Sequence, residues 1–429
     1  MKLAMLKKWA NLIWQNSLVK NTLWMLLAQG LRIVLQAVYF IVIARALGAE
    51  QYGAFVAATA FVGILAPFAN LGSGNLLIKN VSRNKDLFNI YWGNSLIITT
   101  LFGFALVILI QVIYNLFLPS SISSILICLI SISELIFARV VDNAGQAFQS
   151  VQWLSKTAQL SFLPNLLKTF AALSFANLLP NSGAKEWSIF YLMSTAASAI
   201  IGILLVHKSF GVPKIDLIKI KTEFLEGFYF SISLSAQNIY NDIDKTMLGR
   251  LSSLSSAGIY ASAYRIIDVA FVPVRSLLYA AYARFFQQGS TGITGSIQLA
   301  KRLVPIAGIY GAIAGIGLFF FAPIVPNVLG SEYMDAAIAL RWLSPLPLLK
   351  ALHYFAADTL TGAGFQGLRS AVQILTAIFN ILFNLWLIPL YSWQGAAWSS
   401  LASDGLLMIS LWVMVTLIYQ QQEQMLKKK

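Results

Sequence analysis

Apolar and polar residues alternate along this chain in long blocks. Apolar stretches of about 20 residues or more, the length needed to cross the hydrocarbon of a bilayer, recur from end to end and are separated by short polar turns. Twelve stretches meet that length: 21–45, 53–78, 90–118, 121–148, 157–180, 187–207, 224–249, 255–284, 302–329, 334–361, 369–390 and 394–420. The pattern therefore predicts an all-α, polytopic membrane protein with about 12 transmembrane helices.

Composition supports this reading and removes several classes of function. Of the 429 residues, 58% are hydrophobic and 11% charged, with a mean hydropathy of +0.73, whereas soluble chains carry roughly 25% charged residues. Cys128 is the sole cysteine, and His207 and His353 stand alone, so we expect no disulfide, no metal site and no cofactor. No G-x-x-x-x-G-K-[ST] loop is present, so ATP hydrolysis by the chain itself is not expected.

The basic residues predict the orientation. Alternate loops, counted from the N-terminus, hold 19 Lys and Arg, whereas the opposite loops hold only Arg45, Lys185 and Arg250. Cytoplasmic loops carry the basic excess, so both termini are predicted to be cytoplasmic. The formal net charge of +14 then reflects topology, and no nucleic acid partner is expected.

Five segments follow from this topology. Residues 1–20 form a basic N-terminal segment, which is either an amphipathic helix lying in the membrane interface or a frayed tail. The rest divides into a first six-helix bundle, a cytoplasmic linker, a second six-helix bundle and a basic cytoplasmic tail: 21–210, 211–223, 224–420 and 421–429.

The two halves repeat each other weakly. An offset of 205 residues places one outer turn and one polar stripe of the first half on their counterparts in the second: Arg45, Gly53 and Phe55 on Arg250, Gly258 and Tyr260, and Arg32 and Gln36 on Gln237 and Asn241. An offset of 217 aligns Gly145 and Phe148 with Gly362 and Phe365. Repeats of six spans keep the same orientation, which predicts two pseudo-symmetric bundles, a common transporter architecture.

Three turn segments carry a family resemblance. They are Ile43-Ala-Arg-Ala-Leu-Gly-Ala-Glu-Gln-Tyr-Gly-Ala-Phe55, then Asp244-Lys-Thr-Met-Leu-Gly249 followed by Ala257-Gly-Ile-Tyr-Ala-Ser-Ala-Tyr264, and Leu329-Gly-Ser-Glu-Tyr-Met-Asp-Ala-Ala337. In order and spacing they resemble the polysaccharide transporter, or Wzx-type oligosaccharide flippase, branch of the multidrug/oligosaccharidyl-lipid/polysaccharide exporter superfamily.

The resemblance implies a function and a setting. It implies alternating-access flipping of undecaprenyl-diphosphate-linked oligosaccharides from the inner to the outer leaflet of the bacterial cytoplasmic (inner) membrane, for O-antigen, lipopolysaccharide, capsule or exopolysaccharide assembly. The partners it implies are the lipid-linked substrate, membrane lipids and other polysaccharide assembly proteins. Two alternatives stay open, a multidrug or cation antiporter of the same superfamily and a membrane-embedded glycan-modifying enzyme.

Charged residues inside the predicted spans are the candidate site, because a charge facing lipid at mid-helix costs roughly 2.5 to 3.5 kcal/mol on insertion scales. The candidates for substrate binding lie on polar stripes of the first, seventh and eighth helices: Gln29, Arg32, Gln36, Gln237, Asn241 and Arg265. The candidates for ion coupling or internal pairing are Asp242, Asp244, Lys245, Asp268 and Asp358. Charges nearer to helix ends, such as Arg139 and Lys168, are expected to extend toward the membrane surface.

Two arginines have competing interpretations. Arg32 and Arg265 lie roughly 15 to 18 Å into their helices, where either can bind a diphosphate near mid-membrane. The alternative is internal pairing, for example of Arg265 with Asp268 three residues later. No acid on its own helix neutralises Arg32, which favours binding there.

Overall fold

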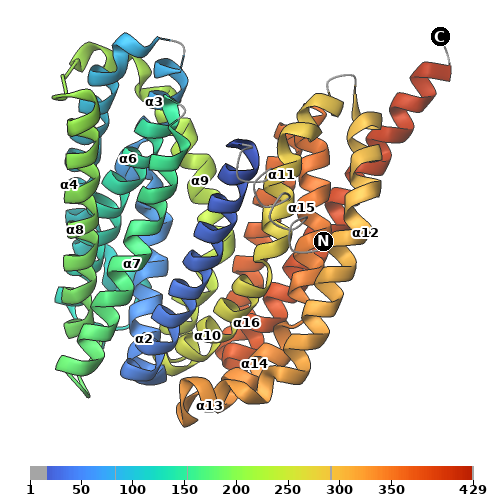
Figure 1. The fold of residues 1–429 in the computed structure, drawn as a ribbon. Helices are drawn as coiled ribbons and strands as arrows, with labels where there is room; N and C mark the ends of the chain where they lie inside the picture. Colours follow the sequence, from blue (N-terminus) through green and yellow to red (C-terminus); the bar gives the residue numbers. More distant parts are fainter. Residues whose placement is uncertain (1–16, 83, 152, 290–291, 428–429) are drawn as a thin grey trace, which may run out of the picture. The chain divides into compact units, whose positions relative to one another are not determined.

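The computed structural model describes residues 17–82, 84–151, 153–289 and 292–427 (Figure 1). Within these ranges the chain is helical and contains no strand. The elements in chain order are α2 (Ser17–Asn70), α3 (Ser73–Val81), η1 (Lys85–Leu87), α4 (Phe88–Phe117), α5 (Ser124–Ile132), η2 (Ser133–Phe137), α6 (Ala138–Ser150), α7 (Leu154–Leu178), α8 (Ala184–Phe210), α9 (Leu217–Leu251), α10 (Leu254–Ala270), α11 (Val272–Gly289), α12 (Ile293–Phe321), η3 (Ala322–Ile324), α13 (Val325–Leu329), η4 (Ser331–Tyr333), α14 (Met334–Leu343), α15 (Leu346–Gly362) and α16 (Gln366–Lys427).

The predicted apolar stretches coincide with these helices. α2 and α16 each contain two helical segments, because the backbone breaks at Gly48 (φ 70°) and at Ser392 (φ 53°). Among the described residues, six helical stretches are long and apolar enough to cross a membrane, or seven if α10 and α11, bent by 50°, count as one. The other predicted spans are not among these stretches.

The predicted terminal segments lie mostly outside the described residues. Of residues 1–20, the structure describes only the start of α2, so neither interpretation of this segment is tested. At the other end, α16 extends to Lys427, into the predicted tail.

The two glycines aligned by the repeat lie against each other. A Cβ added to Gly53 would lie 1.7 Å from the Leu254 carbonyl oxygen, and one added to Gly258 would lie 2.0 Å from that of Ala49. Only hydrogen at these positions lets the backbones of α2 and α10 approach so closely.

A proline inside α2 explains a second close packing. Pro67 has no N–H, so the Gly63 carbonyl four residues earlier loses its helical donor. Asn238 Nδ2 of α9 donates to that carbonyl oxygen at 2.8 Å, and Ser235 Oγ donates to the Ile64 carbonyl oxygen at 2.6 Å. Polar side chains of α9 thus satisfy backbone groups that lipid could not.

The chain forms two compact units. The first comprises residues 1–46, 65–109 and 128–232, and the second comprises 47–64, 110–127 and 233–429. Their boundaries run through α2, α4, α5 and α9, whereas the predicted bundles divide the chain at the linker 211–223. The division into bundles 21–210 and 224–420 therefore stays a topological prediction.

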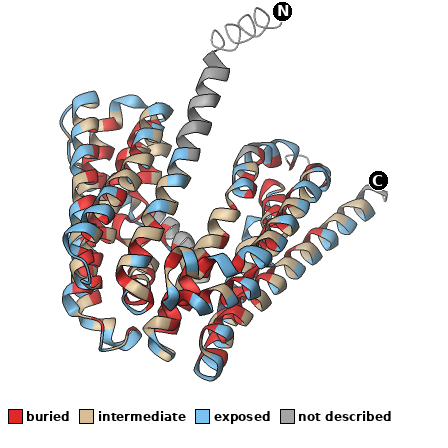
Figure 2. Ribbon diagram, turned by 60° about the horizontal axis from the view of Figure 1, so that its bottom comes forward, coloured by how far each residue is buried: buried red, intermediate tan, exposed pale blue. Residues whose placement is uncertain are grey.

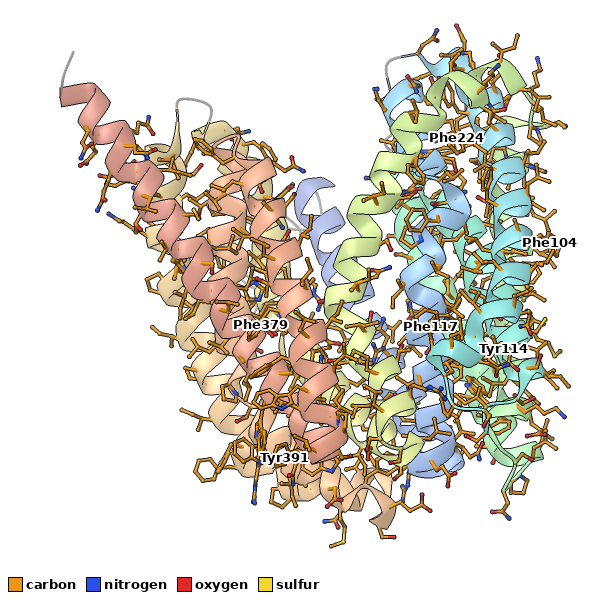
Figure 3. All side chains as sticks on the ribbon, turned by 180° about the vertical axis from the view of Figure 1, so that it is seen from behind. Phe104, Tyr114, Phe117, Phe224, Phe379 and Tyr391 are labelled. Atoms are coloured by element: carbon orange, nitrogen blue, oxygen red, sulfur yellow. The ribbon has the colours of Figure 1, made fainter. Side chains whose placement is uncertain are left out.

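Each unit has its own apolar interior. Trp92 and Phe148 are fully buried in the first unit, and Phe271, Phe285 and Phe355 are buried in the second. Buried residues line the inner faces of the helices and exposed ones the outer faces (Figure 2). Large apolar side chains occupy those outer faces, and Phe104, 52% exposed, projects outward from α4 (Figure 3). Exposed apolar faces of this extent suit a lipid environment.

Candidate functional site

Charged and polar side chains gather inside each unit. The first group, here called the Glu134 cluster, consists of Glu134, Lys168 and Tyr191. The second group, here called the Lys245 cluster, consists of Asp242, Asp244, Lys245, Tyr260 and Ser400.

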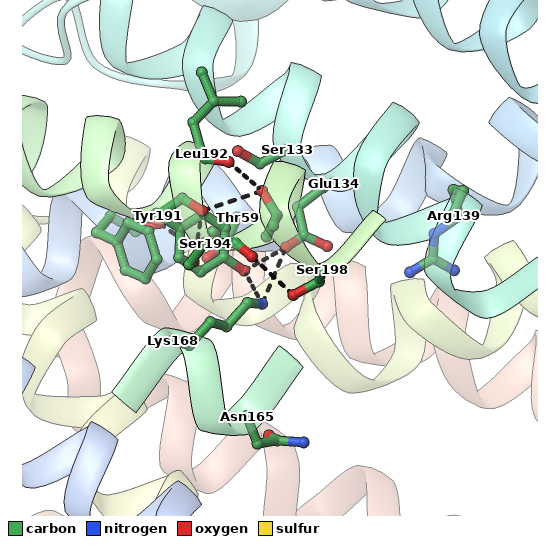
Figure 4. A network of polar contacts seen from close by, with 12 residues as sticks. Thr59, Ser133, Glu134, Arg139, Asn165, Lys168, Tyr191, Leu192, Ser194 and Ser198 are labelled. Atoms are coloured by element: carbon green, nitrogen blue, oxygen red, sulfur yellow. Dashed lines mark hydrogen bonds and ion pairs between the residues drawn. The ribbon is translucent and has the colours of Figure 1, made fainter. Parts of the chain in front are cut away.

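The Glu134 cluster joins three helices of the first unit (Figure 4). Lys168 Nζ of α7 donates to Tyr191 Oη of α8 at 2.6 Å, and the Tyr191 hydroxyl donates to the Glu134 carboxylate. Lys168 Nζ lies 3.9 Å from Glu134 Oε1, and the two side chains are 20% and 17% exposed. The tyrosine hydroxyl therefore links an ammonium to a carboxylate in a partly accessible place.

The backbone at Glu134 is irregular. Ser133–Phe137 is the one π-helical turn in the described part of the chain, and it separates α5 from α6. A π turn inserts an extra residue and changes the direction of the side chains around it, and such turns are frequent at functional sites. This turn places Glu134 opposite Lys168 and Tyr191.

Of the predicted polar stripe of the first helix, the described side chain is that of Gln36, which contacts α7. Gln36 Nε2 of α2 donates to Asn165 Oδ1 of α7 at 3.1 Å, and Asn165 is three residues before Lys168, so the two are neighbours on α7. The side chains of Arg32 and Gln29 lie outside the described residues. The structure therefore brings Gln36 to the cluster and leaves the roles of Arg32 and Gln29 as predictions.

The Lys245 cluster is buried except for Asp242, whose side chain is 44% exposed. Lys245 Nζ lies 2.5 Å from Asp242 Oδ1 and donates to the Asn241 carbonyl oxygen at 3.0 Å. The Tyr260 hydroxyl of α10 donates to Asp244 Oδ2 at 2.5 Å and lies 2.8 Å from Ser400 Oγ of α16. Asp242, Asp244 and Lys245 were predicted site residues. The sequence pattern did not single out Tyr260 and Ser400, which complete the cluster. The side chain of the predicted Gln237 lies outside the described residues.

A second buried lysine faces the same aromatic ring as Lys245. Lys245 Nζ lies 4.7 Å and Lys350 Nζ 4.3 Å from the ring centroid of Tyr264, within the range of cation–π attraction. Lys350 of α15 is 4% exposed. The second unit therefore stabilises two intramembrane ammonium groups with one tyrosine.

The alternative interpretation of Arg265, an ion pair with Asp268, is not seen among the described side chains. Asp268 Oδ1 instead lies 3.7 Å from Arg275 Nη2, seven residues later. α10 ends at Ala270 and α11 begins at Val272 after a 50° bend, so regular helical spacing does not predict contacts across this position. Arg265 is half-buried, and no described carboxylate lies within ion-pair distance of it.

Two further acids are paired. Asp358 Oδ1 lies 3.5 Å from Arg369 Nη1, which also donates to Thr361 Oγ1 at 2.8 Å. His353 Nε2, which stands alone in the sequence, lies 2.9 Å from Asp404 Oδ1, with both side chains almost fully buried.

Lys168 likewise has partners, Glu134 and Tyr191, although its position near the end of a predicted span had indicated a side chain extended toward the membrane surface. These partners are 11 to 51 residues apart on different helices, so spacing gave no signal for them.

The fold and the buried charges define a polytopic helical membrane protein. Two solved structures share the fold: the lipid II flippase MurJ in an inward closed conformation (TM-score 0.76, 13% identity, covering 92% of this chain and 87% of that one), and an inward-facing multidrug resistance MATE family transporter (TM-score 0.73, 15% identity, 90% and 96%). Both are twelve-span, two-lobed proteins, so the predicted fold class is confirmed.

The family follows from the sequence comparisons. Residues 18–287 match the family described as polysaccharide biosynthesis protein, and the chain belongs to this family. A putative O-antigen transporter of Escherichia coli K12 is 23% identical over 91% of this chain and 94% of its own length. A probable low-salt glycan biosynthesis flippase, Agl15 of Haloferax volcanii, is 22% identical over 82% and 74%. The predicted family is confirmed, and the chain is a multi-pass membrane transporter and not an enzyme.

Proposed function

We propose that this protein flips polyprenyl-diphosphate-linked oligosaccharides from the inner to the outer leaflet of a bacterial cytoplasmic membrane by alternating access. The names of its relatives, an O-antigen transporter and a glycan biosynthesis flippase, support a substrate of this class. O-antigen, capsule or exopolysaccharide assembly would then supply the lipid-linked substrate. Other assembly proteins are its expected partners.

The observation that carries the proposal is the set of lysines inside both units. Lys168 of the first unit and Lys350 of the second lie within helices and contact a tyrosine hydroxyl or ring. Cations within membrane-spanning helices are costly and mark substrate or ion pathways. A diphosphate carrying two negative charges needs such cations to enter the membrane.

The acids support a flippase over a cation antiporter. An antiporter needs carboxylates that a cationic substrate can reach. Asp242 is already paired with Lys245, Asp244 accepts from Tyr260, and Asp358 lies beside Arg369. An arriving cation would have to displace these internal donors.

The direct test is lipid flipping by purified protein in liposomes. A fluorescent polyprenyl-diphosphate sugar is incorporated, and its appearance in the opposite leaflet is followed with a membrane-impermeant quencher. We expect Arg32→Ala to abolish flipping and Arg32→Lys to retain part of it, because an ammonium keeps the attraction but loses the bidentate contact. Arg45→Ala, at an exposed position of the same helix α2, is the matched control and should transport normally.

Abundance and thermal stability of the same variants separate binding from structure. A stable Arg32→Ala protein that flips at the wild-type rate would remove Arg32 from the mechanism. Loss of folded protein would instead make Arg32 a structural partner of a buried acid.

The membrane potential is a sufficient driving force for this transport. Two negative charges moving outward across an inside-negative membrane gain roughly 4.6 kcal/mol per 100 mV if both cross the whole field. We expect flipping to slow when the potential is clamped to zero without ion gradients. An unchanged rate under that clamp would argue against the potential as the driving force.

The orientation is tested separately by labelling. Cysteines placed at Lys156 and Lys429 should be cytoplasmic, and one at Lys185 should lie outside, because basic residues are concentrated in the loops assigned to the cytoplasm. An impermeant thiol reagent on intact cells should then label position 185 but not 156. The reverse pattern would overturn the predicted orientation.

A further inference from the structure

The Glu134 cluster contains a carboxylate in an unusual backbone setting. The π turn Ser133–Phe137 interrupts the regular α-helix. Within this turn, Glu134 accepts a hydrogen bond from the Tyr191 hydroxyl and lies near Lys168. A structural ion pair would not need the turn, because a carboxylate and an ammonium on regular helices can meet directly.

Glu134 occupies a place suited to a phosphate. Its carboxylate accepts a hydrogen bond from Tyr191 and lies 3.9 Å from Lys168 Nζ, and a phosphate oxygen could use the same two groups. Both charged side chains are partly exposed. Asn165 and Gln36 extend the polar surface on the same side of α7.

We propose that Glu134 is the internal counter-anion of the empty carrier, which takes the place of the substrate's diphosphate at Lys168 and Tyr191 and is displaced when the substrate binds. This inference rests on the proposed function and assigns to its site a residue that competes with the substrate. In the empty carrier Lys168 stays neutralised during the return step, because an unpaired ammonium inside the membrane is costly. On the outer side, the return of Glu134 to Lys168 helps to expel the diphosphate.

Competition predicts a specific signature for Glu134→Gln. The amide keeps the size of the side chain and accepts from Tyr191, but it no longer neutralises Lys168. We expect about tenfold tighter substrate binding together with slower turnover, because a charge-assisted contact worth about 1.5 kcal/mol or more no longer opposes binding. A purely structural role would weaken binding or lower stability and would not tighten binding.

The experiment measures binding and turnover on the full-length protein in nanodiscs and liposomes. The probe is farnesyl-diphosphate-N-acetylglucosamine, and the dissociation constant is obtained by thermophoresis. Asp142→Asn is the matched control, because its carboxylate is 52% exposed and bound to Arg139, and it should change neither quantity. Lys168→Ala should weaken binding about tenfold or more.

The outcomes separate this inference from the proposed function. If the probe binds and Glu134→Gln leaves affinity unchanged or lowers it, Glu134 does not compete and the inference fails while the flippase remains. If no variant and no wild-type protein binds the probe, the proposed function fails. Loss of binding upon addition of phosphatidylglycerol would assign the site to a phospholipid headgroup and overturn the inference.

A second variant, Glu134→Asp, tests the same competition if Glu134→Gln folds poorly. Glu134→Asp keeps the charge and withdraws it by one methylene from Tyr191 and Lys168. Its binding should be tighter than wild type by a smaller factor, and equal or weaker binding in a stable protein would contradict the competition.

Discussion

Lys168 in the first unit and Lys245 in the second are held in different ways. Lys168 donates to a tyrosine hydroxyl and stays 3.9 Å from its carboxylate, whereas Lys245 lies 2.5 Å from Asp242. The side chains of Lys168 and Glu134 are 20% and 17% exposed. In the second unit the Lys245 side chain is 11% exposed and Asp244 is nearly buried, whereas Asp242 is 44% exposed. The longer separation at Lys168 suits exchange with a ligand. The closer contact at Lys245 suits a fixed part of the framework.

The difference has an energetic reason. Removing one member of a buried pair leaves an uncompensated charge, whereas a partly exposed group can be neutralised by water or a ligand. Substitutions in the second unit should therefore lower stability, and those in the first should change transport more than stability.

The largest expected effect comes from comparing the two lysines. Lys245→Met should lower the free energy of unfolding by about 3–5 kcal/mol, because the buried Asp244 loses the nearby ammonium and Asp242 loses its ion-pair partner. Lys168→Met should cost only about 1–3 kcal/mol and abolish most of the transport. Thermal unfolding in detergent, read by fluorescence size-exclusion chromatography, measures the first quantity, and liposome flipping measures the second. Equal destabilisation by both substitutions would remove the distinction between the clusters.

Removing the hydroxyl of Tyr260 should lower stability more than removing that of Tyr191, and this difference should be smaller than the one between the two lysines. Tyr260→Phe removes a hydroxyl that contacts both Asp244 and Ser400, so we expect a loss of about 1–3 kcal/mol. Tyr191→Phe leaves Lys168 and Glu134 near enough to pair directly, so about 1 kcal/mol is expected. The same melting assay compares them, and a larger loss for Tyr191→Phe would reverse the assignment.

The smallest effects are expected at the exposed ion pairs, one in each unit. Arg139 pairs with Asp142 at 3.0 Å and Arg275 with Asp268 at 3.7 Å, and at least one partner in each pair is about half exposed. Charges exposed within spans face water and not lipid, and hydrated pairs contribute about 0–1 kcal/mol. Arg139→Ala and Arg275→Ala should therefore both melt near the wild-type temperature. A large loss for either would show that its pair is enclosed in the membrane.

Several features of the site could be predicted from the sequence. Charges within apolar stretches were recognised as the candidate site because lipid excludes them, and Asp242, Asp244 and Lys245 indeed form one cluster. The repeat identified Gly53 and Gly258, which the structure places in backbone contact. The candidates Arg32, Gln29 and Gln237 stay predictions.

The sequence by itself determined the helices, the family and the membrane environment, because crossing a bilayer requires about 20 consecutive apolar residues and these are visible in one dimension. Only the tertiary structure decided the partners. Glu134 meets Lys168 and Tyr191 from three different helices, and His353 meets Asp404 across 51 residues. Asp268 of α10 pairs with Arg275 of α11 across the bend between the two helices, and not with Arg265 on its own helix. Periodicity within one helix states which residues share a face, but the packing of helices against each other determines which faces meet.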